Sequence, residues 1–201
     1  MCKKLNLIFL TATKNSSGKD FVANLFVEEI DKIDVYYDVV SLATPVILSY
    51  MNLYSEGRFD FYKIHPHKRV DLLNFSSERK QVDPFIFIKD SIVCIKNIID
   101  STDGDELYIL IPDCRYLYEM ELIIKEIDVD SFFCVNVHRM IEDVEEYSDR
   151  ETQFEFPSKN KFEDILGGVW IELHNDNDIE TLRLNVDNIF KKMRLGDYAK
   201  R

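Results

Sequence analysis

The chain has 201 residues, 46% of them hydrophobic, which is enough for one domain with a real core and excludes a disordered chain. Its 37 acidic and 25 basic residues give a net charge of -12. This charge excludes a broad basic face for nucleic acid or a membrane surface, although it leaves room for a small basic pocket. No apolar run approaches the ~20 residues of a membrane span. The cysteines have no metal-like spacing, so reduced thiols in a cytoplasmic protein are expected.

Short apolar runs alternate with amphipathic segments along the chain. The runs predict strands at 4–11, 35–42, 107–112, 132–138 and 167–174, and the amphipathic segments predict helices at 19–31, 45–54, 83–99, 116–127 and 178–193. Asp83-Pro84 gives the clearest helix start, because aspartate caps free amides and proline suits the first helical position. The charged stretch 55–69 is expected to be irregular. The acidic span 140–164 lacks apolar periodicity and predicts a long loop, with a mobile flap at about 140–160.

Strands that alternate with helices predict a parallel sheet with the first strand in the centre and helices on both faces. The even pattern, without a linker or a repeat, favours one domain over residues 1–201. Ligands of such sheets bind beyond the carboxyl ends of the strands. Those ends are predicted at 11–19, 42–45, 112–115, 138–140 and 174–176.

The turn after the first strand carries the most informative motif, TATKNSSGKD, from Thr11 to Asp20. A phosphate-binding loop needs backbone amides around an anion, a helix N-terminus behind it and a lysine that reaches the terminal phosphates. Ser17-Gly18-Lys19 provides the end of such a loop. The full pattern GxxxxGK[ST] is not met, because Thr13 stands at its first glycine and Asp20 at its hydroxyl position.

Four further segments continue this pattern in chain order. They are LATP (42–45), ERKQVDPFIF (78–87), PDCR (112–115) and Trp170-Ile171. Together with SGKD, they resemble the animal-type phosphomevalonate kinases of the nucleoside-monophosphate-kinase-like P-loop family, and more distantly the phage-type deoxynucleoside monophosphate kinases. That family has SGKD in its loop, L-S-G-P after its second strand, E-K-R-Q-A-D-P-x-F-F further on, and S-D-T-R after its third strand.

This resemblance implies a three-layer α/β P-loop kinase fold with a five-stranded parallel sheet flanked by helices. It implies transfer of the γ-phosphoryl group of ATP-magnesium to the phosphate of mevalonate 5-phosphate, a reaction that depends on positioning and on cations. It also implies roles for particular residues. ATP would be bound by Thr13, Lys14, Ser17, Gly18, Lys19 and Asp20. Catalysis would depend on Lys19, Asp113 and Arg115, with Asp20 or Asp113 organising magnesium through water. The acceptor would be bound by Arg69, Lys80 and Arg115.

Several positions depart from the family pattern. A β-branched Thr13 suits a close phosphate approach poorly, and Asn15-Ser16 replaces two cations of the loop. Tyr116 replaces an arginine, and Arg150 is the only arginine of the acidic segment 140–156, where the family's lid is rich in arginine. An arginine can contribute ~10³–10⁵ in rate to phosphoryl transfer, so these losses indicate decayed catalysis.

Two hypotheses therefore stay open. The first is a non-catalytic descendant, a pseudokinase with a binding or structural role, protein partners or a homo-oligomeric state, and no remaining need for ATP-magnesium. The second is an active ATP-dependent small-molecule kinase that phosphorylates phosphomevalonate or a nucleoside monophosphate. The richness in Ile, Lys, Asn, Tyr and Phe is typical of AT-rich genomes, viral ones among them, which adds host cytoplasm or virion as locations.

Overall fold

The computed structural model describes residues 3–12, 17–54, 66–139, 155–176 and 178–196, with only the backbone of 54 and 66–69. Its strands are β1 (Lys4–Thr11), β2 (Tyr36–Val39), β3 (Glu106–Ile111), β4 (Ser131–His138) and β5 (Val169–His174). Its helices are α1 (Lys19–Asp31), α2 (Thr44–Tyr54), α3 (Pro66–Val82), α4 (Ile86–Ser101), α5 (Leu117–Glu126), α6 (Lys159–Lys161), which continues into the π-helical turn η3 (Phe162–Leu166), and α7 (Ile179–Leu195).

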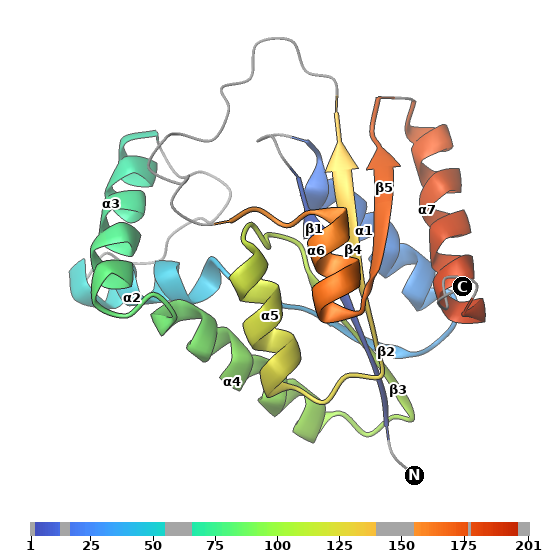
Figure 1. Cartoon of the computed structure of the whole chain (residues 1–201), viewed down its shortest axis with the longest axis horizontal. Coiled ribbons are helices and arrows are strands. Elements are labelled where there is room, and N and C mark those ends of the chain that lie inside the picture. Colours follow the sequence, from blue (N-terminus) through green and yellow to red (C-terminus); the bar gives the residue numbers. More distant parts are fainter. Residues whose placement is uncertain (1–2, 13–16, 55–65, 140–154, 177, 197–201) are drawn as a thin grey trace.

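The described strands form one parallel sheet in the order β2-β3-β1-β4-β5, with β1 in the centre (Figure 1). Leu7 of β1 lies opposite Ile109 of β3 on one side and Phe132 of β4 on the other. The predicted parallel sheet with a central first strand is confirmed. All its described strands end at one edge, where β1 ends at Thr11.

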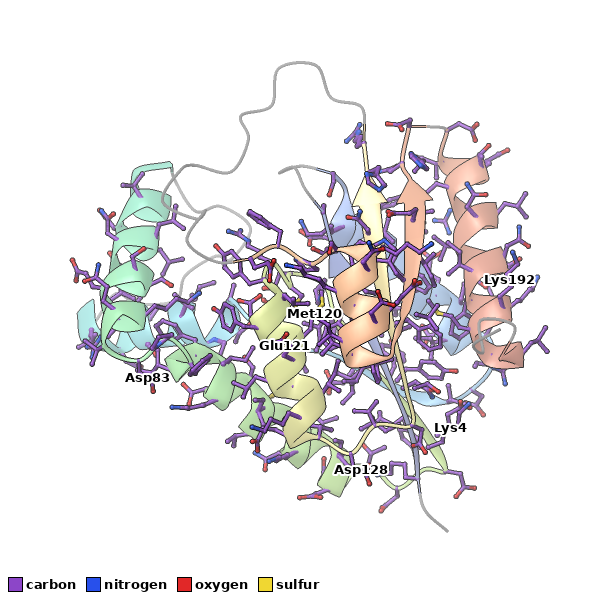
Figure 2. The ribbon with its side chains drawn as sticks, in the orientation of Figure 1. Lys4, Asp83, Met120, Glu121, Asp128 and Lys192 are labelled. Carbon is purple, nitrogen blue, oxygen red and sulfur yellow. The ribbon has the colours of Figure 1, made fainter. Side chains whose placement is uncertain are left out.

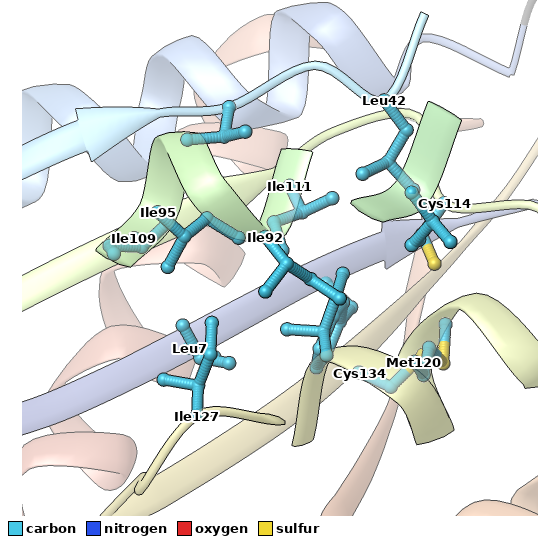
Figure 3. Close-up of a cluster of buried hydrophobic side chains, with 14 of the residues drawn as sticks. Leu7, Leu42, Ile92, Ile95, Ile109, Ile111, Cys114, Met120, Ile127 and Cys134 are labelled. Atoms are coloured by element: carbon cyan, nitrogen blue, oxygen red, sulfur yellow. The ribbon is translucent and has the colours of Figure 1, made fainter. Parts of the chain in front are cut away.

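Side chains of successive strand residues point to opposite faces, and both faces are apolar. Leu5, Leu7 and Phe9 of β1 belong to the cluster covered by α4, α5 and η3, part of which Figure 3 shows around Leu7, Ile92 and Met120. Ile8 and Leu10 belong to the cluster covered by α1 and α7. The chain is thus a three-layer α/β structure, as the sequence predicts.

Helix α3 covers part of a stretch that the sequence predicts to be irregular, 55–69. The polar composition of this segment gives no helical pattern of apolar residues. The helix packs on the rest of the protein through the aromatic ring of Phe75. The ring of Phe75 lies 5.6 Å from that of Tyr50 in α2 and 6.2 Å from that of Phe87 in α4. Helix α4 begins at Ile86 and not at Asp83, whose carboxylate instead accepts the Phe85 N–H at 3.0 Å in the preceding turn.

The prediction of a loop over 140–164 is wrong at its end, which is helical and carries the buried Phe162. Residues 140–154 lie outside the described residues, but 159–166 are helical and Phe162 is fully buried. Its ring packs edge-on against Phe9 at 6.3 Å, Phe132 at 5.8 Å and Trp170 at 6.0 Å. The last part of the predicted loop, from Lys159 on, is therefore helical and contributes Phe162 to the core.

Charged side chains lie on the outside of the molecule, among exposed apolar ones such as Val82 and Ile165. Figure 2 shows Lys192 on the outer side of α7, and Lys4 and Asp128 at the amino end of the sheet, opposite the edge where the strands end. Among the described residues, no helix combines the length and the apolar composition that crossing a bilayer requires.

Candidate functional site

Helix α1 begins directly behind the loop that follows β1. Gly18 precedes its first residue with φ 89° and ψ 20°, a left-handed conformation that glycine adopts without strain. As a glycine, Gly18 has no side chain that could cap the first amides of α1. Ser17 is buried, and its Oγ has no hydrogen-bond partner among the described residues. The Ser17 hydroxyl is therefore a buried polar group without a described partner beside the start of α1, while Thr13 and Lys14 lie outside the described residues.

Lys19 is half-buried at this helix end. Burial, and then the positive charge of Arg115, hold its pKa below the usual value, although Asp20 and Asp113 act in the opposite direction. Within the described part of the chain, no carboxylate forms an ion pair with the Lys19 ammonium. The fold thus brings Lys19 and Arg115 close enough to repel each other at the positive end of a helix dipole.

Asp113, which follows β3, fixes the turn between β2 and α2. Its Oδ2 accepts the Ser41 hydroxyl at 2.6 Å and the Ala43 N–H at 2.9 Å, and its Oδ1 accepts the Leu42 N–H at 2.8 Å. Both carboxylate oxygens therefore have protein partners. This geometry joins the two predicted segments LATP and PDCR, and its first consequence is structural.

Glu119 organises the turn that carries Arg115. Its Oε2 accepts the backbone N–H groups of Arg115 at 2.9 Å and Tyr116 at 3.0 Å, which caps α5. Burial raises the pKa of Glu119 above its usual value, while these hydrogen bonds and the charge of Lys80 oppose the change. The sequence did not single out Glu119, although its place three residues after Tyr116 is typical of a helix cap.

Lys80 approaches this turn from α3. Its ammonium lies 5.6 Å from the centre of the Tyr116 ring, which in turn stacks on Tyr118 at 5.7 Å. Arg69 lies in the first turn of the same helix, and its side chain is outside the described residues. The Lys80 side chain and the Arg115 backbone therefore both lie beside Tyr116 and Glu119.

The ends of β4 and β5 contribute residues that the sequence reasoning missed. Glu172 accepts the Trp170 indole N–H at 2.6 Å and the Asn136 amide at 2.9 Å, and it lies 2.5 Å from His138 Nε2. Although burial opposes it, these hydrogen bonds hold the pKa of Glu172 below its usual value. The one signal in the sequence was the position of these residues near predicted strand ends.

The donor set of this edge suits phosphate better than a bare metal. No cluster of three or more His, Cys, Asp or Glu side chains suited to a metal ion occurs in the part of the chain that the structure describes. Of the two carboxylates that the sequence offered for magnesium, Asp113 is hydrogen-bonded in the β2–α2 turn. The other, Asp20, is exposed to solvent.

No family model and no curated protein matches this sequence. Among solved structures, a mutant of the Mycobacterium tuberculosis APS kinase CysC is similar over 94% of this chain and 99% of its own, with 13% identity and a TM-score of 0.49. A dephospho-CoA kinase from Campylobacter jejuni is similar over 96% of this chain and 99% of its own, with 14% identity and a TM-score of 0.42. The fold of this chain is a five-stranded parallel α/β sheet in the order β2-β3-β1-β4-β5, with β1 in the centre and α1 directly after the β1 loop in the sequence.

Proposed function

We propose that this protein binds the phosphate groups of a nucleotide between β1 and α1, as the nucleotide site of a small-molecule kinase. The observation that carries the proposal is Lys19, a half-buried cation at a helix N-terminus preceded by a glycine, whose pKa is lowered by burial and by Arg115. Two cations and a helix dipole of the same sign disfavour one another in the free protein. A bound phosphate is negatively charged, so it would attract Lys19, Arg115 and the positive end of the helix dipole and offset their repulsion.

The loop residues fit a nucleotide phosphate. The amides at the start of α1, the left-handed Gly18 and the unpartnered Ser17 hydroxyl would hold its oxygens, and Lys19 would reach the terminal phosphates. Bound ATP would supply the γ-phosphoryl group. Asp20 is the better candidate to hold magnesium through water, because both oxygens of Asp113 already have protein partners.

The acceptor would lie on the side of Lys80 and Arg115. A small hollow lined by Lys80, Glu119 and Tyr118 adjoins a groove of about 280 Å³ between α2, α3 and α4, and Phe87 lines both. A phosphorylated acceptor brings negative charge that these cations would offset. Mevalonate 5-phosphate, which the resemblance implies, and nucleoside monophosphates are the first acceptors to test, with Arg69 as a further cation.

The second candidate function is phosphate or nucleotide binding without transfer, as in a pseudokinase that acts through protein partners. One observation favours it specifically. Asp113, proposed from the resemblance as a catalytic residue, is held by three hydrogen bonds in the β2–α2 turn. The replacement of the first loop glycine by Thr13 points the same way.

A thermal-shift titration tests the proposal, because a ligand that binds the native state alone raises its stability. ATP-magnesium and ADP should give saturable increases in melting temperature that Lys19→Met removes. No increase at millimolar nucleotide would contradict nucleotide binding. ADP release with mevalonate 5-phosphate or nucleoside monophosphates would then identify an active kinase, and binding without ADP release would identify the second candidate.

A further inference from the structure

Asn175, the residue after β5, joins three distant segments. Its side-chain amide donates a hydrogen bond to the Ser17 carbonyl at 2.8 Å, across 158 residues of sequence. Its backbone N–H donates to the His138 carbonyl at 2.7 Å, at the end of β4. A Cβ atom on Gly18 would lie 2.3 Å from Asn175 Nδ2, so the amide packs directly on this glycine. Asn175 therefore contacts the phosphate loop where it turns into α1.

The contact fixes the direction of a backbone donor. In a planar trans peptide the carbonyl of Ser17 and the N–H of Gly18 point in opposite directions. Because Asn175 holds the carbonyl on its own side, the Gly18 N–H points away from Asn175. Gly18 is left-handed and Lys19 is helical, and such a pair turns successive N–H groups toward one point, where an anion binds.

We propose that Asn175 is a positioning residue for the phosphate site: by holding the Ser17 carbonyl, it aims the N–H groups of Gly18 and Lys19 at the terminal phosphates of a nucleotide. This inference rests on the proposed function. The restraint matters in this loop because Thr13 replaces the glycine at the loop's other end. Asn175 touches the loop and not the phosphate, so its effect passes through the peptide between Ser17 and Gly18.

The backbone contact to His138 survives any substitution at position 175 except proline. Asn175→Ala therefore removes the hydrogen bond to Ser17 and keeps the connection between β4 and β5. Asn175→Asp keeps the shape of the side chain, but a carboxylate cannot donate to the Ser17 carbonyl and repels it. Asn188→Ala, on the exposed side of α7, is the matched control.

The test is the dissociation constant of ATP-magnesium, measured by calorimetric titration of the full chain and its variants. Asn175→Ala should weaken binding about five- to tenfold, the effect of one hydrogen bond. Asn175→Asp should weaken it at least as much, and Asn188→Ala should leave it unchanged. If wild type binds ATP and Asn175→Ala binds it equally well, the inference is wrong while the proposed function stands.

A second readout does not depend on the nucleotide. The Val22 N–H donates to the Gly18 carbonyl at 2.9 Å, and its hydrogen exchange in the free protein should be faster in Asn175→Ala than in wild type, with the amides of β3 unchanged. A loss of protection over the whole chain would indicate a general structural role and overturn the inference, as would unchanged exchange at Val22. If wild type does not bind ATP, the proposed function fails, and local loosening of the loop would still support the positioning contact.

Discussion

Substitution of Lys19 by methionine should stabilise the free protein and abolish its stabilisation by nucleotide. Methionine keeps an apolar stem of similar length, so the change removes mainly the charge. That charge lies at the positive end of α1 and is half-buried, and burial and the charge of Arg115 both disfavour it. A like charge at a helix end costs ~0.3–1 kcal/mol, and we expect a gain of about this size at pH 7.

The difference in unfolding free energy between Lys19→Met and wild type should change sign between the free and the ATP-bound protein. At an ATP concentration of one hundred times the dissociation constant, binding stabilises wild type by about 2.7 kcal/mol. The variant lacks this term, so wild type should then be the more stable by roughly 2 kcal/mol. Urea unfolding at pH 7, with and without ATP-magnesium, measures both differences. Lys159→Met is the control, because Lys159 also begins a helical segment but is exposed.

The pH dependence of stability tests whether the charge of Lys19 causes the expected difference between wild type and Lys19→Met. The pKa of Lys19 in the folded protein lies below its usual value of 10.5, so the folded state releases this proton before the unfolded chain does. The unfavourable charge is fully present below the folded pKa and disappears as pH rises toward 10.5, and wild-type stability rises relative to Lys19→Met over that window. If Lys19→Met instead destabilises the free protein and ATP has no effect, Lys19 is a structural cation and the reasoning is refuted.

Three further outcomes are expected. Phe162→Ala should lower the free energy of unfolding by about 3–5 kcal/mol in urea titrations, whereas Phe21→Ala, at an exposed position, should change it little; equal effects would remove Phe162 from the core. Asp113→Ala should cost about 2 kcal/mol because it leaves the turn amides without their acceptor, and a neutral result would contradict its structural role. Burial raises the pKa of Cys114 well above its usual value, so iodoacetamide should label the exposed Cys94 in the native protein and Cys114 only in urea; native labelling of Cys114 would be inconsistent with its burial.

The sequence predicts those elements whose pattern is local. The apolar run of β1 and the spacing of Val22, Leu25 and Phe26 in α1 identify both elements, and the helix bounds 19–31 are confirmed. Helix α3 escapes prediction because Phe75 is the side chain that buries it, against partners from other helices. Phe162 escapes for the same reason: a lone aromatic after an acidic stretch has no periodicity.

The residues of the candidate site also differ in whether a local sequence pattern identifies them. SGKD stands in one continuous segment, so Ser17, Gly18 and Lys19 can be found from a motif and from their position after a strand. Asn175 has no motif, and its relation to Ser17 depends on how β4 and β5 align at the carboxyl edge of the sheet. The acceptor-binding roles assigned to Arg69 and Lys80 remain predictions, as do the roles of the loop residues.

The measurement that tests phosphate binding at the β1–α1 loop most directly is a ¹⁵N amide spectrum of the full chain during titration with ATP-magnesium. The amides of Ser17, Gly18, Lys19 and Asp20 should shift the most and should saturate together. Inorganic phosphate at higher concentration should move the same amides in the same direction. The absence of shifts at millimolar ATP, or shifts confined to the groove around Phe75, would contradict the proposed site.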